Sequence, residues 1–260
     1  MPTDLLILLS PVNIILFVLV LTRLGGLMTS APIFSTFPVP PQVKIWFVVF
    51  VSFIMFPMVQ SKTSLSVPPD MITLTVLLLK EFMIGYIVGF IANIVFISVQ
   101  IAAELISIQS GLSSAQALNP LSGESTSVLS SLYMIFASFV FIALNAQQWL
   151  FASIYRSFQT VPPGYSFIFS GQLVQNIVSL TGQMFTIGIG IALPIFSVLL
   201  ITDVLLAFTS KVMPQMNVFM VSLPLKIYIG ILLVLIFLRP MFEHLASVLQ
   251  GMLTSLVGLF

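Results

Sequence analysis

The chain contains no cysteine, so disulfide bridges, cysteine-ligated metal sites and cysteine nucleophiles are excluded together. Only 6% of its 260 residues are charged, whereas a typical soluble domain carries about 25%. Because 59% of the residues are hydrophobic, lipid or partner chains must cover surface that charges cannot cover. This composition predicts an integral membrane protein and excludes soluble, disordered and fibrous classes.

The recognition motifs of common enzymes are also missing. The sequence has one histidine and contains no HExxH motif, Walker A loop or GxGxxG fingerprint. Its net charge of +1 comes without a basic cluster, which argues against binding of nucleic acid. We therefore expect no catalytic residues, no metal ligands and no cofactor.

Long apolar segments dominate the chain and predict an all-α membrane fold, since a span needs about 20 apolar residues. They cover 5–30, 43–60, 71–109, 128–152, 173–210 and 218–238, followed by an amphipathic tail at 241–260. The segment 43–60 is marginally short. The segment 71–109, about 58 Å long as a helix, must break, tilt or project beyond the bilayer. No basic residue precedes the first apolar run, since the first one, Arg23, lies near its end, so we expect this run to be retained rather than cleaved.

Prolines interrupt several apolar runs, and each is expected to kink or break its helix, although Pro57 could equally close one. They are Pro57, Pro194, Pro214, Pro224 and Pro240. Lysine and arginine flank the apolar runs almost evenly, so the positive-inside rule gives no orientation. Together these features indicate kinked hairpins packed inside a larger assembly.

Charges within apolar segments are costly and tend to be functional. They are Arg23, Lys80, Glu81, Glu104 and Asp203. They could form a transport path, a proton relay or subunit ion pairs. Alternatively, they form structural pairs that only fix helix packing.

One helix face in the segment 71–109 is polar or small. Glu81, Gly85, Gly89, Asn93, Gln100 and Glu104 fall within an arc of about 140° at 100° per residue. Gly85 and Gly89 form a GxxxG motif, which permits close helix approach. This face is expected to meet something polar or tightly packed.

The segment 107–127 is small, polar and poor in helix formers. It either lines or closes a channel, or it is an ordinary solvent-exposed connector.

Two further functions of the whole chain remain open. Broken helices also suit a secondary transporter that works alone, and Ser113 with His244 could form a serine–histidine pair of an intramembrane protease.

Five phrases in order resemble the FliR family of flagellar biosynthetic proteins, whose counterpart in virulence secretion is the SctT family. They are Arg23-Leu-Gly-Gly26 with Ala31-Pro32; Lys80-Glu81 leading to Gly85 and Gly89; Gln109-Ser-Gly111 with Asn119-Pro120; Ala192-Leu-Pro194 with Asp203; and Pro214-Gln-Met-Asn-Val-Phe219 followed by Leu223-Pro-Leu-Lys226. The chain departs from the family at Asn145-Ala-Gln-Gln-Trp149 and at Ala207, where histidine and glycine are frequent.

The resemblance implies a non-enzymatic subunit of the flagellar type III export gate. Residues 1–165 would be FliP-like, and residues 166–260 would be a FliQ-like helical hairpin. A plug loop would span 107–122 and include Gln109, Gly111, Ser113, Ser114, Gln116, Asn119 and Pro120. Arg23, Lys80, Glu81, Gly85, Gly89, Glu104 and Asp203 would hold helices and subunits in register.

The implied partners are several copies each of FliP and FliQ, together with FlhB, FlhA, membrane lipid and unfolded flagellar export substrates. The implied location is the bacterial inner membrane within the flagellar basal body, largely above the membrane plane. The residues do not separate flagellar from virulence export.

Overall fold

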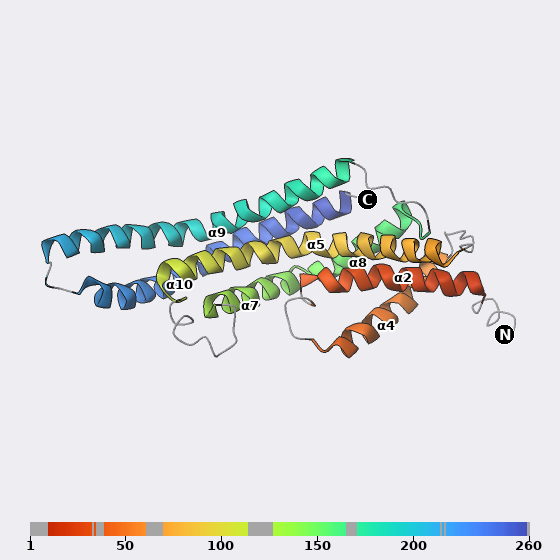
Figure 1. The fold of residues 1–260 in the computed structure, drawn as a ribbon, viewed down its shortest axis with the longest axis horizontal. Coiled ribbons are helices and arrows are strands. Elements are labelled where there is room, and N and C mark those ends of the chain that lie inside the picture. The colour runs from red at the N-terminus through yellow and green to blue at the C-terminus, as the bar shows by residue number, and fades with distance from the viewer. Residues whose placement is uncertain are drawn as a thin grey trace. The chain divides into compact units, whose positions relative to one another are not determined.

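A computed structural model describes residues 10–32, 34, 39–60, 70–113, 127–164, 171–213, 215 and 217–258 (Figure 1). All regular structure in these residues is helical, which confirms the predicted all-α class. The helices are α2 (Pro11–Ser30), α4 (Pro41–Gln60), α5 (Met71–Ser110), α7 (Val128–Ala143), α8 (Ala146–Thr160), α9 (Gly171–Val212) and α10 (Val218–Gly258).

Five of these helices are long and apolar enough to cross a membrane, or up to six if α7 and α8 together form one broken span. Helix α5 runs for 40 residues without interruption, about 60 Å and twice the thickness of the hydrocarbon core. Of the three outcomes expected for this segment, a break is therefore excluded. The segment predicted at 128–152 is in fact two helices.

The division between α7 and α8 occurs at Leu144 and Asn145. Asn145 adopts φ 52, the left-handed conformation that asparagine tolerates better than most side chains. The Leu144 N–H still bonds the Val140 carbonyl, 3.0 Å away, so α7 ends in a satisfied turn. The apolar sequence of this region did not indicate the helix break, because hydrophobic periodicity does not report the backbone conformation of a single residue.

Of the two outcomes expected at the interrupting prolines, a kink or a break, a break is excluded at four of the five positions. Pro57, Pro194, Pro224 and Pro240 all lie inside continuous helices. Each proline removes one backbone donor, but the backbone groups of the neighbouring turns keep the rest of the helix hydrogen-bonded. Pro214 lies outside the described residues, in the connection between α9 and α10.

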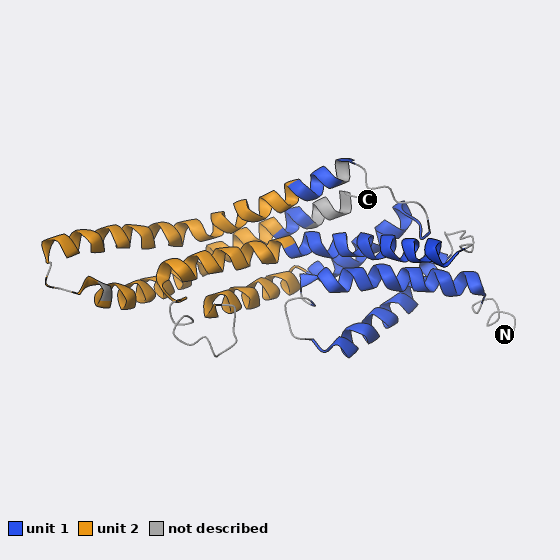
Figure 2. Ribbon diagram, in the orientation of Figure 1, with its two compact units in different colours: residues 1–93, 145–178, 249–260 blue, residues 94–144, 179–248 orange. Residues whose placement is uncertain are grey.

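The chain packs as two compact units (Figure 2). Unit 1 comprises residues 1–93, 145–178 and 249–260, and unit 2 comprises residues 94–144 and 179–248. The unit boundaries fall inside α5, α9 and α10. The predicted division into residues 1–165 and 166–260 is based on resemblance to FliP and FliQ, whereas the two units are defined by packing. The predicted division therefore stays a prediction.

The core of unit 1 forms where α2 meets the first half of α5, α4 and α8. Leu19 and Val20 of α2, Val88 of α5 and Ile154 of α8 are fully buried. On α4, one face packs on α2, where the Phe56 ring lies edge-on to Phe17 at 5.8 Å. The other faces of α4 are exposed and apolar.

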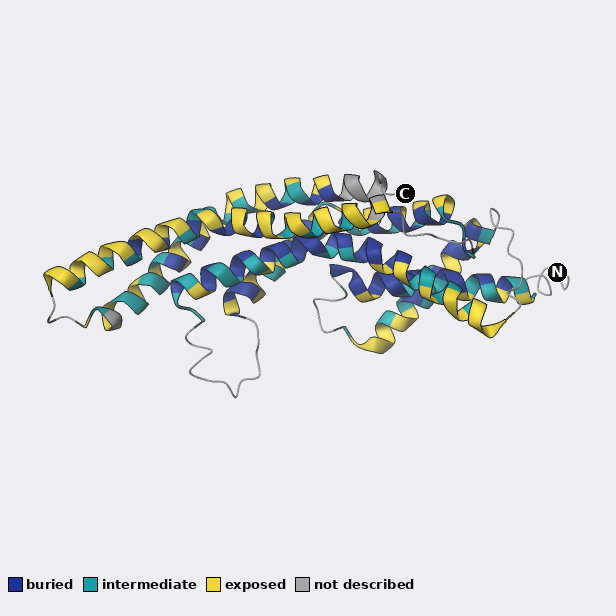
Figure 3. Cartoon of the chain, turned by 45° about the horizontal axis from the view of Figure 1, so that its top comes forward, coloured by how far each residue is buried: buried dark blue, intermediate teal, exposed yellow. Residues whose placement is uncertain are grey.

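The core of unit 2 forms along the second half of α5. Val95, Phe96 and Val99 of α5 are fully buried, and the Phe96 ring meets Phe141 of α7 edge-on at 5.7 Å. The outer faces of α9 and α10 are different, since only 28% and 17% of their span windows are buried, against 61% for α5 (Figure 3). These faces require lipid or another protein to cover them.

Candidate functional site

A buried ion pair lies at the centre of unit 1. Arg23 Nε of α2 donates to Glu81 Oε2 of α5 at 2.6 Å. The side chains are 0% and 3% exposed. An isolated charge in such a place would be very costly, so each residue depends on the other for its place in the core.

Two segments complete the shell around Arg23. Its Nη1 donates to Ser157 Oγ of α8 at 3.1 Å, and its Nη2 donates to the Val161 carbonyl at 3.0 Å. Its guanidinium carbon lies 4.2 Å from the centroid of the Phe158 ring, within range of a cation–π contact. Each of the three guanidinium nitrogens thus has a hydrogen-bond partner, one on α5 and two at the C-terminal end of α8.

The partners of Arg23 are themselves held in place. Ser157 Oγ accepts from Arg23 and donates to the Ile154 carbonyl at 2.7 Å, so its hydroxyl is fully oriented. The second Glu81 oxygen, Oε1, accepts the Gly164 backbone N–H at 3.4 Å, after the end of α8. The pair therefore fixes α2, α5, α8 and the turn at 161–164 relative to one another within unit 1.

Glycines bring α2 and α5 into backbone contact beside this pair. A Cβ on Gly85 would collide with the Arg23 carbonyl, and one on Gly26 with the Phe82 carbonyl. A Cβ on Gly89 would collide with Ser30 Oγ, whose hydroxyl donates to the Tyr86 carbonyl at 2.9 Å. Small residues on both helices let the two backbones approach closely, and this approach brings the Arg23 and Glu81 side chains together.

Unit 2 contains a second polar cluster, centred on Asp203 of α9. Its carboxylate lies 2.8 Å from Lys226 Nζ of α10, through Oδ1, and accepts from Gln109 Nε2 of α5 at 2.8 Å, through Oδ2. The Asp203 side chain is 43% exposed and that of Lys226 is 18% exposed. One carboxylate thus joins three helices near the end of α5.

Glu104 links α5 to the start of α7 in the same unit. Ser130 Oγ donates to Glu104 Oε2 at 3.1 Å, and Ser127 caps α7 by accepting the Ser130 backbone N–H at 3.1 Å. Both described ends of the segment 107–127 are therefore hydrogen-bonded to polar side chains. The two anchors are Gln109 at its start and Ser127 with Ser130 at its end.

Comparison with known proteins bears on what these clusters serve. The sequence profile of the bacterial export proteins, family 1, matches residues 14–252, which is nearly the whole chain. The chain belongs to this export family. The Arg23–Glu81 pair, the glycine contact and the Asp203 cluster all lie inside the matched region.

Curated relatives agree with this assignment and with the FliR resemblance. The chain is 28% identical over 234 residues to the flagellar biosynthetic protein FliR of Bacillus subtilis (strain 168), covering 89% of each protein. It is 27% identical over 241 residues to that of Escherichia coli (strain K12), covering 92% of this chain and 91% of the relative. The FliR of Aquifex aeolicus (strain VF5) is 27% identical over 216 residues, covering 82% of this chain and 81% of the relative.

The predicted plug residues of this export-family member are only partly described. Gln109 lies in the last turn of α5, and Gly111 and Ser113 lie in the turn that follows it, where Gly111 adopts φ 80 and the Ser113 N–H bonds the Ser107 carbonyl at 3.4 Å. Ser114, Gln116, Asn119 and Pro120 lie outside the described residues. Lys80 is half-buried and immediately precedes Glu81 on α5.

The serine–histidine pair of the protease alternative does not form. Gly111, two residues before Ser113, lies against Leu223 near the start of α10. His244 follows Leu223 on that helix by about six turns, on the order of 30 Å. Proton transfer between the two side chains is impossible at such a separation. Nor do the described residues contain a group of three or more His, Cys, Asp or Glu that could hold a metal ion.

Sequence reasoning did not include Ser157, Phe158 or Lys226 among the site residues. Ser157 is 134 positions from Arg23, and nothing local to either residue indicates the contact. A weak signal was present on α8, where Ser153, Ile154, Ser157 and Phe158 recur at helical spacing and are all buried. Lys226 belongs to the phrase Leu223-Pro-Leu-Lys226 that resembles the FliR family. Its partner Asp203 is on the preceding helix, so this phrase alone does not indicate the ion pair.

Proposed function

We propose that this chain is the FliR-type subunit of a flagellar type III export gate. In this proposal it joins several copies each of FliP and FliQ in a channel for unfolded flagellar proteins, and FlhB and FlhA act beside it. The chain itself carries out no enzymatic reaction. The observation that carries the proposal is the match to the export family over 14–252, with flagellar relatives that are covered over most of their length.

Unit 1 would serve as the rigid body of the subunit. The Arg23–Glu81 pair and the Gly26, Gly85 and Gly89 contacts fix α2 on α5 through short, buried interactions. A gate subunit needs such a fixed body because cargo passes repeatedly without taking it apart. By length and composition the apolar helices suit the bacterial inner membrane, and we place the assembled subunit in the flagellar basal body.

The segment 107–122 would serve as the plug that closes the channel at rest. The support is chemical, since Gln109, Gly111, Ser113, Ser114, Gln116, Asn119 and Pro120 form an uncharged polar sequence within an apolar chain. The described start of this segment is held through Gln109 to Asp203, which in turn holds Lys226. The FliP-like character of residues 1–165 and the FliQ-like character of residues 166–260 belong to the same proposal.

Export of flagellin tests the proposed function. In the source bacterium, deletion of this gene is expected to abolish appearance of flagellin in the growth medium while flagellin remains inside the cell. A plasmid copy of the gene should restore export. Normal export from the deletion strain, with no second copy of the gene present, would contradict the proposal.

A further inference from the structure

A cavity of about 190 Å³ lies among α7, α9 and α10, wholly within unit 2. Tyr133 of α7, Gly190 and Pro194 of α9, and Pro240 and His244 of α10 are among the residues that line it. One buried water requires about 10–15 Å³ of such space. The cavity therefore has room for several water molecules, and its chemistry depends on the polar groups that face it.

Tyr133 brings a buried polar group to this cavity. The residue is only 1% exposed, and its hydroxyl has no hydrogen-bond partner among the described residues. A buried hydroxyl without a partner is destabilising, and the large majority of such groups in folded proteins are bonded to protein or to ordered water. Because Tyr133 lines the cavity, a molecule bound there can supply the missing partner.

Pro194 leaves a second polar group without its usual partner, on the α9 side of the cavity. In a helix, the N–H of residue 194 would donate to the Gly190 carbonyl, but proline has no N–H. Helix α9 nevertheless continues through Pro194. Space beside Gly190 is open, since an added Cβ would meet nothing within 4 Å. The Gly190 carbonyl can therefore accept a hydrogen bond from a molecule in the cavity.

His244 supplies a third polar group, from α10. A neutral imidazole has one donor nitrogen and one acceptor nitrogen, and this imidazole has no hydrogen-bond partner among the residues that the structure describes. Tyr133, Gly190 and His244 thus line one space from three different helices. Buried water in proteins typically makes about three hydrogen bonds, which is the number of groups present here.

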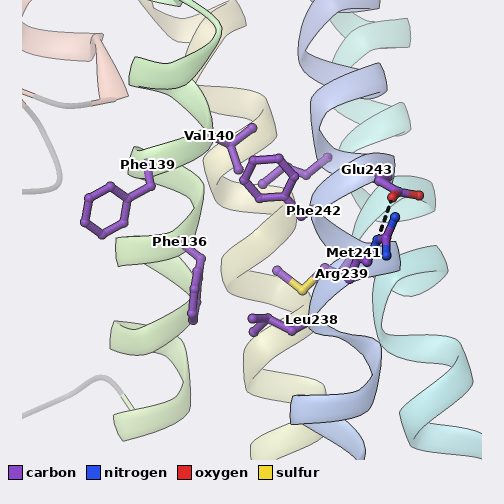
Figure 4. Close-up of a pocket in the computed structure, with 9 residues that line it drawn as sticks. Phe136, Phe139, Val140, Leu238, Arg239, Met241, Phe242 and Glu243 are labelled. Carbon is purple, nitrogen blue, oxygen red and sulfur yellow. Dashed lines mark hydrogen bonds and ion pairs between the residues drawn. The ribbon is translucent and has the colours of Figure 1, made fainter.

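The neighbouring groove between α7 and α10 has a different chemistry (Figure 4). It measures about 530 Å³ and shares Met241 with the smaller cavity. Its lining is apolar except for Arg239 and Glu243, which pair with each other at 3.2 Å and project from the side of α10 away from α7. Within the described part of the chain, the unpaired buried polar groups are therefore at the smaller cavity and not at this groove.

We propose that the smaller cavity is a binding site for ordered water, held by the Tyr133 hydroxyl, the Gly190 carbonyl and the His244 imidazole. Water suits the site better than an acyl chain of lipid or detergent, which would leave all three groups unpaired. The lining residues of α9 and α10 belong to candidate membrane spans. Water there replaces the donor that Pro194 removes, which helps α9 to continue through the proline.

Hydroxyl-radical footprinting of the full-length chain in nanodiscs tests the site. X-rays generate radicals from bound water, and these radicals oxidise the side chains that touch it. After correction for intrinsic reactivity, Tyr133 should be oxidised several-fold faster than Phe141, which is equally buried on the same helix but does not line the cavity. Equally slow oxidation of the two residues would overturn the proposal. Oxidation of both at the rate of the denatured chain would also overturn it, because α7 itself would then be open to solvent.

Pro194→Ala tests the role of the Gly190 carbonyl. Alanine restores the N–H that this carbonyl lacks, so the bound water loses a partner and oxidation of Tyr133 should fall several-fold. Pro224→Ala is the matched control, since it makes the same change inside α10 but away from the cavity, and it should leave Tyr133 oxidation unchanged. Oxidation of Tyr133 that is unaltered by Pro194→Ala would overturn the proposal. None of these outcomes depends on whether the chain exports flagellin.

Discussion

Arg23 Nε lies 2.6 Å from Glu81 Oε2, and neither side chain is more than 3% exposed. Only 6% of the residues are charged, and two of these charged residues are buried from solvent in unit 1. Removal of one partner leaves the other charge buried with neither a counter-charge nor water. Substitution of one residue of the pair is therefore a sensitive test of the fold.

Glu81→Ala should destabilise the protein by about 3–5 kcal/mol, because Arg23 then stays buried without a counter-charge. The measurement is the unfolding free energy in mild detergent, followed by circular dichroism as denaturant is added. The double variant Arg23→Met with Glu81→Leu should lose less than Glu81→Ala alone. If Glu81→Ala stays within about 0.5 kcal/mol of the unaltered chain, the usual range for surface substitutions, the pair is not buried as described.

Gly85→Ala should cost about 1–3 kcal/mol, because its Cβ would collide with the Arg23 backbone and force α2 away from α5. Gly182→Ala is the matched control, since nothing lies within 4 Å of its Cβ on α9. That control should be neutral or slightly stabilising, because alanine favours the helix over glycine. Thermal denaturation of both variants in one detergent compares them directly, and equal behaviour would refute the close contact.

Asp203→Asn separates the export subunit from a transporter that works alone. The carboxylate is 43% exposed, so loss of its charge should reduce stability only modestly. In a strain that lacks all secretion genes, we expect solute uptake to be the same with the variant and the unaltered chain. A marked loss of uptake with Asp203→Asn would favour the transporter.

Deletion of residues 110–118 tests the plug. The deletion removes most of the polar segment after Gln109, so assembled gates should leak ions at rest. Leakage is measured as conductance of purified gates in planar bilayers, and only gates that still contain FliP and FliQ are compared. Unchanged conductance in such gates would rule out a plug role for this segment.

Much of the fold was accessible from the sequence, for physical reasons that particular residues illustrate. The long apolar runs predicted α2, α4, α5, α9 and α10, because an apolar run of about 20 residues or longer has few alternatives to a helix in a membrane. The GxxxG motif at Gly85 and Gly89 indicated a close helix contact. The left-handed Asn145 was not predictable, because one residue's backbone conformation does not affect hydrophobic periodicity.

The candidate site was predicted less completely. Arg23 and Glu81 were singled out as costly charges, but their contact joins residues 58 positions apart and follows only from the packing of α2 on α5. The sequence also did not decide between a kink and a break at Pro194. Helix α9 is continuous there, since a proline costs one hydrogen bond and neighbouring turns can retain the rest.

Native mass spectrometry of the tagged chain, co-expressed with FliP and FliQ in mild detergent, tests the central claim most directly. A gate subunit predicts one copy of this chain held with several copies of each partner. A stable monomer or homodimer that ignores both partners would contradict the account.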